Sequence, residues 1–327
     1  MPGPVPLVRL VRSGVVESVH VGSVVVADAD GRILAVAGDP DRVTFTRSCA
    51  KPLQAAVSRS AMTAPLPEDL LALACGSHNG EPAHVAGVRR VLRRAGLPVA
   101  ALGCPADRPS RGADAARVAR PSPVFHNCSG KHAAMLLAAV DAGWDPATYL
   151  APRHPLQRAV LRAVRAATDA DPTVGVDGCG VPVHALPLRA IATLYARLSA
   201  PERLPSLAPY VAAATAAMRA HPFLVAGTGR SDTALIERLP GVVAKVGAEG
   251  LHCATVPGSG IGIAVKIEDG AERASAPALL EALVASGLVT RGAAGDPALR
   301  GVARRPVLGG GRPVGTVEAS FSLHRPR

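Results

Sequence analysis

The chain has 327 residues, 48% of them hydrophobic, which is enough to bury a large core. Its formal charge is +11, but the arginines are spread along the chain and only eight residues are aromatic, so nucleic-acid binding is not expected. Six cysteines are too few for a disulfide scaffold, and no apolar run approaches the roughly 18 residues of a membrane span. The N-terminus lacks the features of a signal peptide, so we expect a cytoplasmic protein with no membrane partner.

Strand patterns lie near both ends of the chain, and helical patterns lie between them. Residues 19–26 and 33–36 flank the turn Asp28-Ala-Asp-Gly31 and predict an antiparallel pair, followed by a strand at 43–46. Helices are predicted at 50–62, 68–75, 83–95, 130–142, 155–168, 187–198, 207–220 and 276–286, and further strands at 242–246, 261–267 and 314–321.

This order predicts an α/β (α+β) fold in a single domain over residues 1–327. An antiparallel sheet is expected from about 8–47 and 241–322, flanked by helices, with a helical region over about 48–240. Residues 105–123 are rich in Pro, Arg, Ala and Asp and are the best candidate for a mobile loop over a site.

Lysine is scarce, because only four of the thirty-six basic residues are lysine. Arginine stays protonated, whereas a desolvated lysine can lose its proton and act as a base. Lys51 follows Ser48 by three residues at the start of a predicted helix, so the hydroxyl and the amine share a face. This pattern predicts a nucleophile beside its base, provided that burial and nearby cations lower the lysine pKa from about 10.4 toward 7 to 8. The alternative is that Ser48 caps the helix and Lys51 is solvated.

Two further motifs follow Ser48-x-x-Lys51 in the chain. Ser77-His78-Asn79 closes a predicted helix, and Lys245 lies on a predicted strand two residues before a glycine. Ser-x-x-Lys, Ser-x-Asn and Lys-x-Gly occur in this order in serine penicillin-recognising enzymes, which favours the catalytic interpretation. Lys131 and Lys245 could supply the positive field around Lys51. His78 is either a base or, as is more common for such a residue, structural.

Cys128 and Cys179 lie in polar, glycine-marked turns. Their separation matches no zinc-finger spacing, and by themselves they indicate buried free cysteines. Ordinary ligand chemistry would add His132 or Asp177 to a metal site, and not Lys131, because an amine binds metal only when neutral.

Four segments together closely resemble the asparaginase II family, the rhizobial-type L-asparaginases, over about residues 8–320. They are Ser-Cys-Ala-Lys-Pro from residue 48, Cys-Gly-Ser-His-Asn-Gly-Glu from 75, Asn-Cys-Ser-Gly-Lys-His-Ala from 127 and Asp-Gly-Cys-Gly-Val-Pro from 177. The resemblance implies a fold similar to serine β-lactamases and glutaminases, hydrolysis of L-asparagine to aspartate and ammonia, and a homodimer. It implies Ser48, Lys51 and Ser77 as catalytic residues, with Lys245 placed by its Lys-x-Gly context. It also implies a zinc ion held by Cys128, Lys131 and Cys179.

The mechanism expected from these motifs is acyl transfer. Ser48, deprotonated by neutral Lys51 directly or through Ser77, would attack the side-chain amide of asparagine, and water would hydrolyse the aspartyl ester. Charged and polar groups must hold the rest of the substrate, and the candidates are Arg47, His78, Asn79, Glu81 and Arg230. Glu81 could instead cap a helix, and Arg230 could form a surface ion pair. A glutaminase or other amidase, and a non-catalytic zinc-binding or sensor protein, are the alternatives.

Overall fold

The computed structural model describes residues 3–326, and strands from both ends of that range form one antiparallel sheet. The order is β10-β11-β1-β2-β9-β8-β7, and β3 pairs with β2 beside this path. The strands are β1 (Val5–Arg12), β2 (Val15–Asp28), β3 (Ile33–Ala37), β7 (Val243–Val246), β8 (Leu251–Thr255), β9 (Ile261–Ile267), β10 (Arg304–Gly309) and β11 (Arg312–Ala319). The predicted class, mixed α/β with an antiparallel sheet from the two ends, is confirmed. That the chain forms one domain stays a prediction.

The strand predicted at 43–46 is present but lies outside this sheet, so the expected sheet boundary of 47 is wrong. β4 (Val43–Phe45) belongs to a second sheet of order β4-β6-β5, with β5 (Thr173–Val176) and β6 (Pro182–Pro187). The N–H of Thr46 donates to the carbonyl of His184 at 2.8 Å, which directs the chain away from β3 and into the helical region. The sequence did not predict β5 and β6, because both are short and contain glycine or proline.

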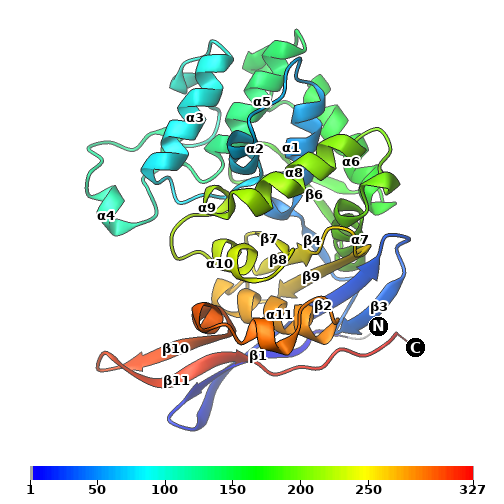
Figure 1. Cartoon of the computed structure of the whole chain (residues 1–327), viewed down its shortest axis with the longest axis vertical. Coiled ribbons are helices and arrows are strands. Elements are labelled where there is room, and N and C mark those ends of the chain that lie inside the picture. The colour runs from blue at the N-terminus through cyan, green and yellow to red at the C-terminus, as the bar shows by residue number, and fades with distance from the viewer. Residues whose placement is uncertain (1–2, 327) are drawn as a thin grey trace.

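Residues between the two halves of the main sheet form most of the helices (Figure 1). They are α1 (Lys51–Ser60), α2 (Glu68–Cys75), α3 (Pro82–Arg94), α4 (Gly112–Ala115), α5 (Ser129–Asp141), α6 (Pro155–Thr168), α7 (Leu188–Ser199), α8 (Ala208–Ala220), α9 (Pro222–Val225) and α10 (Ser231–Arg238). The seven long helices predicted here are confirmed to within about two residues at each end, whereas α10 was not predicted. α1 is buried from residue 51 to 58, so it is a core helix of this region.

Two helices pack against the main sheet. α7 contacts β2, β8 and β9, and α11 (Glu272–Ala285) contacts β1, β8, β9 and β11. Figure 1 shows α7 on the side of the sheet that faces the helical region and α11 on the other side. Within residues 3–326, no helix combines the length and apolar character that a membrane crossing requires.

Candidate active site

Ser48 lies in a tight turn between the small sheet and the core helix. The segment Arg47–Ala50 forms a 3-10 turn (η1), and α1 begins directly after it at Lys51. The residue that caps α1 is Ala50, so Ser48 is not the helix cap that the alternative interpretation required. Arg47 has φ of +43°, a conformation that costs a non-glycine residue energy and is often found at functional sites. Ser48 itself is half-buried and reachable from solvent.

The turn is fixed by contacts to two of the other motifs. Nε of Arg47 donates to Oδ1 of Asp177 at 2.7 Å, which joins it to the segment that contains Cys179. The thiol of Cys49 donates to the carbonyl of Lys245 at 3.0 Å, which joins it to β7. Residues on either side of Ser48 therefore hold it between the edge strand of the main sheet and the Asp-Gly-Cys-Gly turn.

Lys51 points into the protein, and its side chain is fully buried. Its Nζ lies 2.6 Å from the carbonyl oxygen of Gly76, 2.8 Å from Oγ of Ser77 and 3.4 Å from the carbonyl oxygen of Asn127. Among residues 3–326, no hydrogen bond joins this amine to Ser48. The serine that the lysine contacts directly is therefore Ser77, which comes from the turn after α2.

The three acceptors around Nζ of Lys51 define what each protonation state can do. An ammonium group donates to all three. A neutral amine has two N–H donors and one lone pair, and a carbonyl oxygen can only accept, so both donors go to Gly76 and Asn127. The lone pair is then left for the hydroxyl proton of Ser77.

The surroundings favour this neutral form. Burial is the main cause that lowers the pKa of Lys51 to about 8, and the positive charges of Lys131 and Lys245 lower it further. Cys128 and Cys179 act in the opposite direction and raise this pKa. An amine with this pKa is in the range in which a general base works near neutral pH.

Lys245 is also fully buried, but its partners are different. Its Nζ donates to Oδ2 of Asp232 at 3.0 Å and to the carbonyl of Val246 at 2.9 Å, and Nε2 of His252 lies 2.9 Å from Oδ1 of Asp232. Burial opposes ionisation of Asp232, yet Lys245, His252 and the N–H of Val246 together hold the pKa of this carboxyl well below its usual range. Lys245 thus forms a buried ion pair and hydrogen-bonds to neither candidate serine within the described residues.

The sequence did not identify Asp232 or His252. Asp232 lies two residues after Arg230, a substrate-binding candidate, in Gly227-Thr-Gly-Arg230-Ser-Asp232, and this proximity was the available signal. His252 lies on β8, and nothing in its local sequence distinguishes it from an ordinary strand residue.

His78 is fully buried, and both ring nitrogens have partners. Nδ1 accepts from the N–H of Gly80 at 3.1 Å, so Nε2 carries the proton and donates to Oγ of Ser129 at 3.1 Å. Burial holds the pKa of His78 well below its ordinary value, and His84, which stacks on the ring, adds to the effect. This arrangement favours the structural alternative for His78, because neither nitrogen is left for a substrate.

Asn79, Glu81 and Arg230 meet in one polar network. The amide of Asn79 donates to Glu81 and to the carbonyl of Thr228, both at 3.0 Å, while Arg230 donates to its Oδ1 at 3.1 Å. Glu81 also accepts from the N–H and the hydroxyl of Thr228, both at 2.8 Å, and from Arg111 at 3.1 Å. Arg230 thus forms no surface ion pair in the described part of the chain.

Glu81 caps a helix and also presents its carboxylate to the polar network, so the two roles considered for it are compatible. It is the cap of α3, in a capping box with His84, and its carboxylate also organises the network. Burial raises the pKa of Glu81, but the hydrogen bonds from Thr228, Asn79 and Arg111 outweigh it and bring the pKa to about 2. The carboxylate is therefore ionised at any pH at which an enzyme of this kind would work. Arg111 was not among the candidate residues, but it lies in residues 105–123, which the sequence marked as a candidate loop over a site.

The loop that brings Thr228 to the network depends on glycine at position 227. Gly227 has φ of +111°, and a Cβ there would lie 2.5 Å from Oε1 of Glu81 and 2.8 Å from Nδ2 of Asn79. Both the backbone conformation and the close approach exclude a larger residue without rearrangement.

Cys128, Lys131 and Cys179 converge in a buried cluster. Nζ of Lys131 lies 3.2 Å from Sγ of Cys179, while the thiol of Cys128 donates to Oδ1 of Asn127 at 3.0 Å. The neighbouring side chain of Cys179 is the main cause that holds the pKa of Cys128 well below its ordinary value, whereas the pKa of Cys179 is raised, chiefly by Cys128. Burial lowers the pKa of Lys131, but Cys128 and Cys179 outweigh it and raise it overall.

The other two candidate ligands do not complete this cluster. Nδ1 of His132 lies 2.6 Å from the hydroxyl of Tyr149, and Asp177 accepts from Arg47 and, at 3.5 Å, from Cys179. In the described part of the chain, no group of three or more His, Cys, Asp or Glu side chains could hold a metal ion. The donor set is thus two sulfurs and one amine, and it fits zinc if both thiols and the amine give up their protons.

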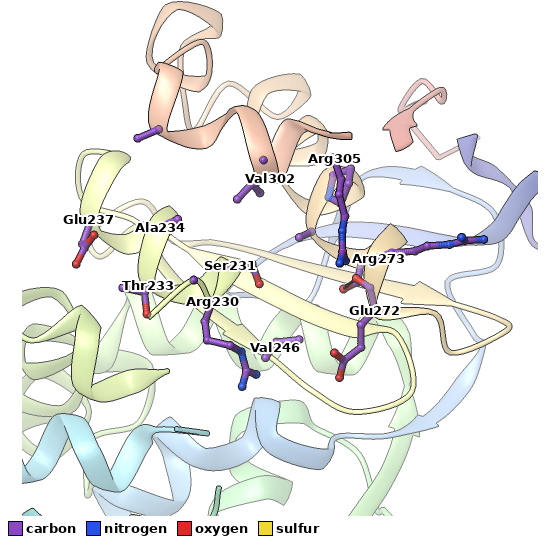
Figure 2. Close-up of a pocket in the computed structure, with 16 residues that line it drawn as sticks. Arg230, Ser231, Thr233, Ala234, Glu237, Val246, Glu272, Arg273, Val302 and Arg305 are labelled. Atoms are coloured by element: carbon purple, nitrogen blue, oxygen red, sulfur yellow. Dashed lines mark hydrogen bonds between the residues drawn. The ribbon is translucent and has the colours of Figure 1, made fainter. Parts of the chain in front are cut away.

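A cavity of about 510 Å³ lies near this site, but neither Ser48, Lys51 nor Ser77 lines it. It is bordered by α10, the start of α11 and the segment around Val302 and Arg305 (Figure 2). Arg230 is the member of the polar network that reaches it.

Residues 8–319 match the family model of L-asparaginase II, and the chain belongs to that family. It is therefore an amidohydrolase, and the family that the motifs indicated is confirmed. No curated protein matches the chain.

Solved structures similar to this one include Mglu and a β-lactamase from Mycobacterium bovis. Mglu has 15% identity and a TM-score of 0.47, over 89% of this chain and 72% of that chain. The β-lactamase also has 15% identity, with a TM-score of 0.37 over 81% of this chain and 94% of that chain.

Proposed function

We propose that the protein is an L-asparaginase that hydrolyses L-asparagine to L-aspartate and ammonia. The observation that carries this proposal is the environment of Nζ of Lys51, in which two carbonyls occupy the donors of the neutral amine and Ser77 faces its lone pair. In a family of L-asparaginases, such an amine in contact with a serine hydroxyl supports amide hydrolysis by a serine nucleophile.

The proposed reaction begins when Ser48, the more accessible of the two serines, attacks the amide carbon of the asparagine side chain. Its proton passes to Ser77, whose own proton passes to the neutral amine of Lys51. Backbone N–H groups near Ser48 would stabilise the oxyanion, although the start of α1 offers few, because the N–H of Lys51 already donates to the carbonyl of Ser48 and Pro52 has none. Lys51 then returns its proton to the leaving ammonia, and water hydrolyses the aspartyl ester by the same path in reverse.

Lys245 and the polar network have supporting parts in this proposal. The ammonium of Lys245, fixed by Asp232, is a positive charge that adds to the effect of burial in lowering the pKa of Lys51. Glu81 and Arg230 would hold the substrate's ammonium and carboxylate groups, and Arg47 would contribute a second cation. A homodimer in the cytoplasm is also proposed, and light scattering of the purified protein would test the dimer.

Zinc held by Cys128, Lys131 and Cys179 is part of the proposal. When bound, it would supply a fixed positive charge and fasten the two turns together. Ser48 provides the nucleophile, so no metal-bound hydroxide is needed. Lys131 would bind the ion as a neutral amine and would no longer contribute a charge of its own.

The decisive experiment compares ammonia release from asparagine, glutamine and a peptide amide, using the wild type and the Ser48→Ala variant. We expect asparagine to be the preferred substrate and the variant to lose nearly all activity. Faster turnover of glutamine would make the protein a glutaminase. Undiminished activity in the variant would remove Ser48 as nucleophile, and no ammonia release from any amide would favour a binding protein.

A further inference from the structure

The charged side chains around the 510 Å³ cavity lack partners of opposite charge. Arg230, Arg273, Arg305, Glu237 and Glu272 line it, and none of the five forms an ion pair within 4.0 Å in the part of the chain described. The bonds of Arg230 and Arg273 go to neutral partners, Asn79 and His20.

A second cavity on the same side of the molecule gives a direct comparison. It has a volume of about 380 Å³ and is also lined by arginines and carboxylates. There Arg9 and Arg304 pair with Glu318, and Arg291 pairs with Glu281, whereas Arg300 and Asp296 form no ion pair in the part of the chain described. Most charges of the second cavity are therefore paired, while all five charges of the larger cavity are unpaired within residues 3–326.

Both signs of charge are present in the larger cavity. Figure 2 shows Val246 between the side chains of Arg230 and Glu272, with Arg305 and Val302 across from them. A ligand that neutralises this lining must carry a carboxylate for the arginines and an ammonium group for Glu272. A free amino acid carries both groups, and the volume lies in the range usual for small-molecule sites.

We propose that this cavity is a second binding site, distinct from the catalytic serines, for a free amino acid in its zwitterionic form. Arg273 and Arg305 bind the carboxylate and Glu272 binds the ammonium group, while Arg230, which also lines the cavity, is left to the catalytic site. With those three residues, this site does not depend on the asparaginase assignment, because neither Ser48, Lys51 nor Ser77 lines the cavity.

α10 connects the cavity to the catalytic region. Its outer face, with Ser231, Ala234 and Glu237, lines the cavity, while Asp232 of the same helix holds Lys245. Thr233 also lines the cavity, and its hydroxyl donates to the carbonyl of Gly227 at 2.8 Å, at the start of the loop that carries Thr228. Ligand binding should therefore reduce the local opening of α10, which hydrogen exchange can measure.

The test is hydrogen exchange of the full chain with and without L-aspartate at millimolar concentration. We expect slower exchange in residues 231–238 and 272–277 and in the segment around Val302. Arg305→Ala should weaken this binding about tenfold, as expected for one charge-assisted hydrogen bond, and Arg305→Lys should recover most of it. Arg238→Ala is the matched control, because Arg238 is exposed on the same helix but does not line the cavity.

Two further ligands separate the zwitterion from simple anions. Succinate has the carboxylates without the ammonium group, and inorganic phosphate tests for general anion binding, so both should give little protection. Three results would overturn the proposal. L-aspartate could slow exchange only in residues 47–51 and 76–81, succinate or phosphate could slow exchange as much as L-aspartate does, or Arg305→Ala could respond to L-aspartate as the wild type does. Hydrogen exchange measures binding and not turnover, so this test can fail or succeed whatever the asparaginase assay shows.

Discussion

The protonation of Lys51 should control the dependence of activity on pH. Burial and the neighbouring cations lower its pKa from 10.5 to about 8. At pH 7 about one molecule in ten then has the neutral amine, compared with roughly one in three thousand for an unperturbed lysine. The fraction of neutral amine is therefore about 300-fold larger at pH 7, which corresponds to roughly 3 kcal/mol.

The sign follows from the role of the amine. The group acts as a base only when neutral, so activity should be half-maximal near pH 8, nearly complete about one unit higher, and should fall about tenfold per unit well below pH 8. The assay is ammonia release between pH 5.5 and 9.5, with kcat/KM corrected for the ionisation of free asparagine. Circular dichroism at each pH would establish that the protein stays folded.

Lys51→Arg provides the control, because a guanidinium group stays protonated over the whole range. We expect this variant to lose about a thousandfold in kcat at every pH, in line with the loss of a general base. A rate that is independent of pH between 6 and 8, or a midpoint near the ordinary lysine value, would refute the assignment of Lys51 as the base.

Three other changes have defined outcomes. Ser77→Ala should lower kcat by about a hundredfold or more without a large change in KM, because the active-site amine loses the hydroxyl that it deprotonates; a normal kcat would exclude the relay. Gly227→Ala, whose Cβ would lie 2.5 Å from a carboxylate oxygen of Glu81, should lower the free energy of unfolding in urea by about 2 kcal/mol or more. The control is Gly258→Ala, which also has a positive φ but no atom within 4 Å of the new Cβ, so it should lower the free energy of unfolding by less. Cys179→Ser should lose stoichiometric zinc in elemental analysis, whereas Cys75→Ser, a buried cysteine outside the cluster, should retain whatever the wild type holds.

Patterns of hydrophobic residues predicted most of the fold. The helices that matched, such as α2 and α6, have strong local periodicity and clear ends, so local sequence alone determines their bounds. β5 and β6 are short, and the pairing of β6 with β4 joins residues more than a hundred positions apart. No local pattern could show that residues 43–45 leave the main sheet to join them.

The sequence motifs identified candidate residues of the site, but they did not predict which residues contact one another. The spacing of Ser48 and Lys51 suggested direct contact along one helix face, but the 3-10 turn at Arg47–Ala50 changes that geometry. The amine turns instead toward Gly76 and Ser77, which are close only because α1 and α2 pack together. Similarly, the ion pair of Lys245 with Asp232 depends on how α10 lies against β7, and α10 itself was not predicted.

The sheet built from both ends of the chain has a consequence for synthesis on the ribosome. The central strand β2 pairs with β9, so that Gly22 lies opposite Ile267. A growing chain exposes the unpaired edge of β2 until its last quarter has been translated, and such non-local pairing folds slowly. Ser48, Lys51 and Ser77 are all made early, yet β7, which holds the Ser48 turn, appears much later. Nascent chains should therefore remain inactive and prone to aggregation until translation is nearly complete.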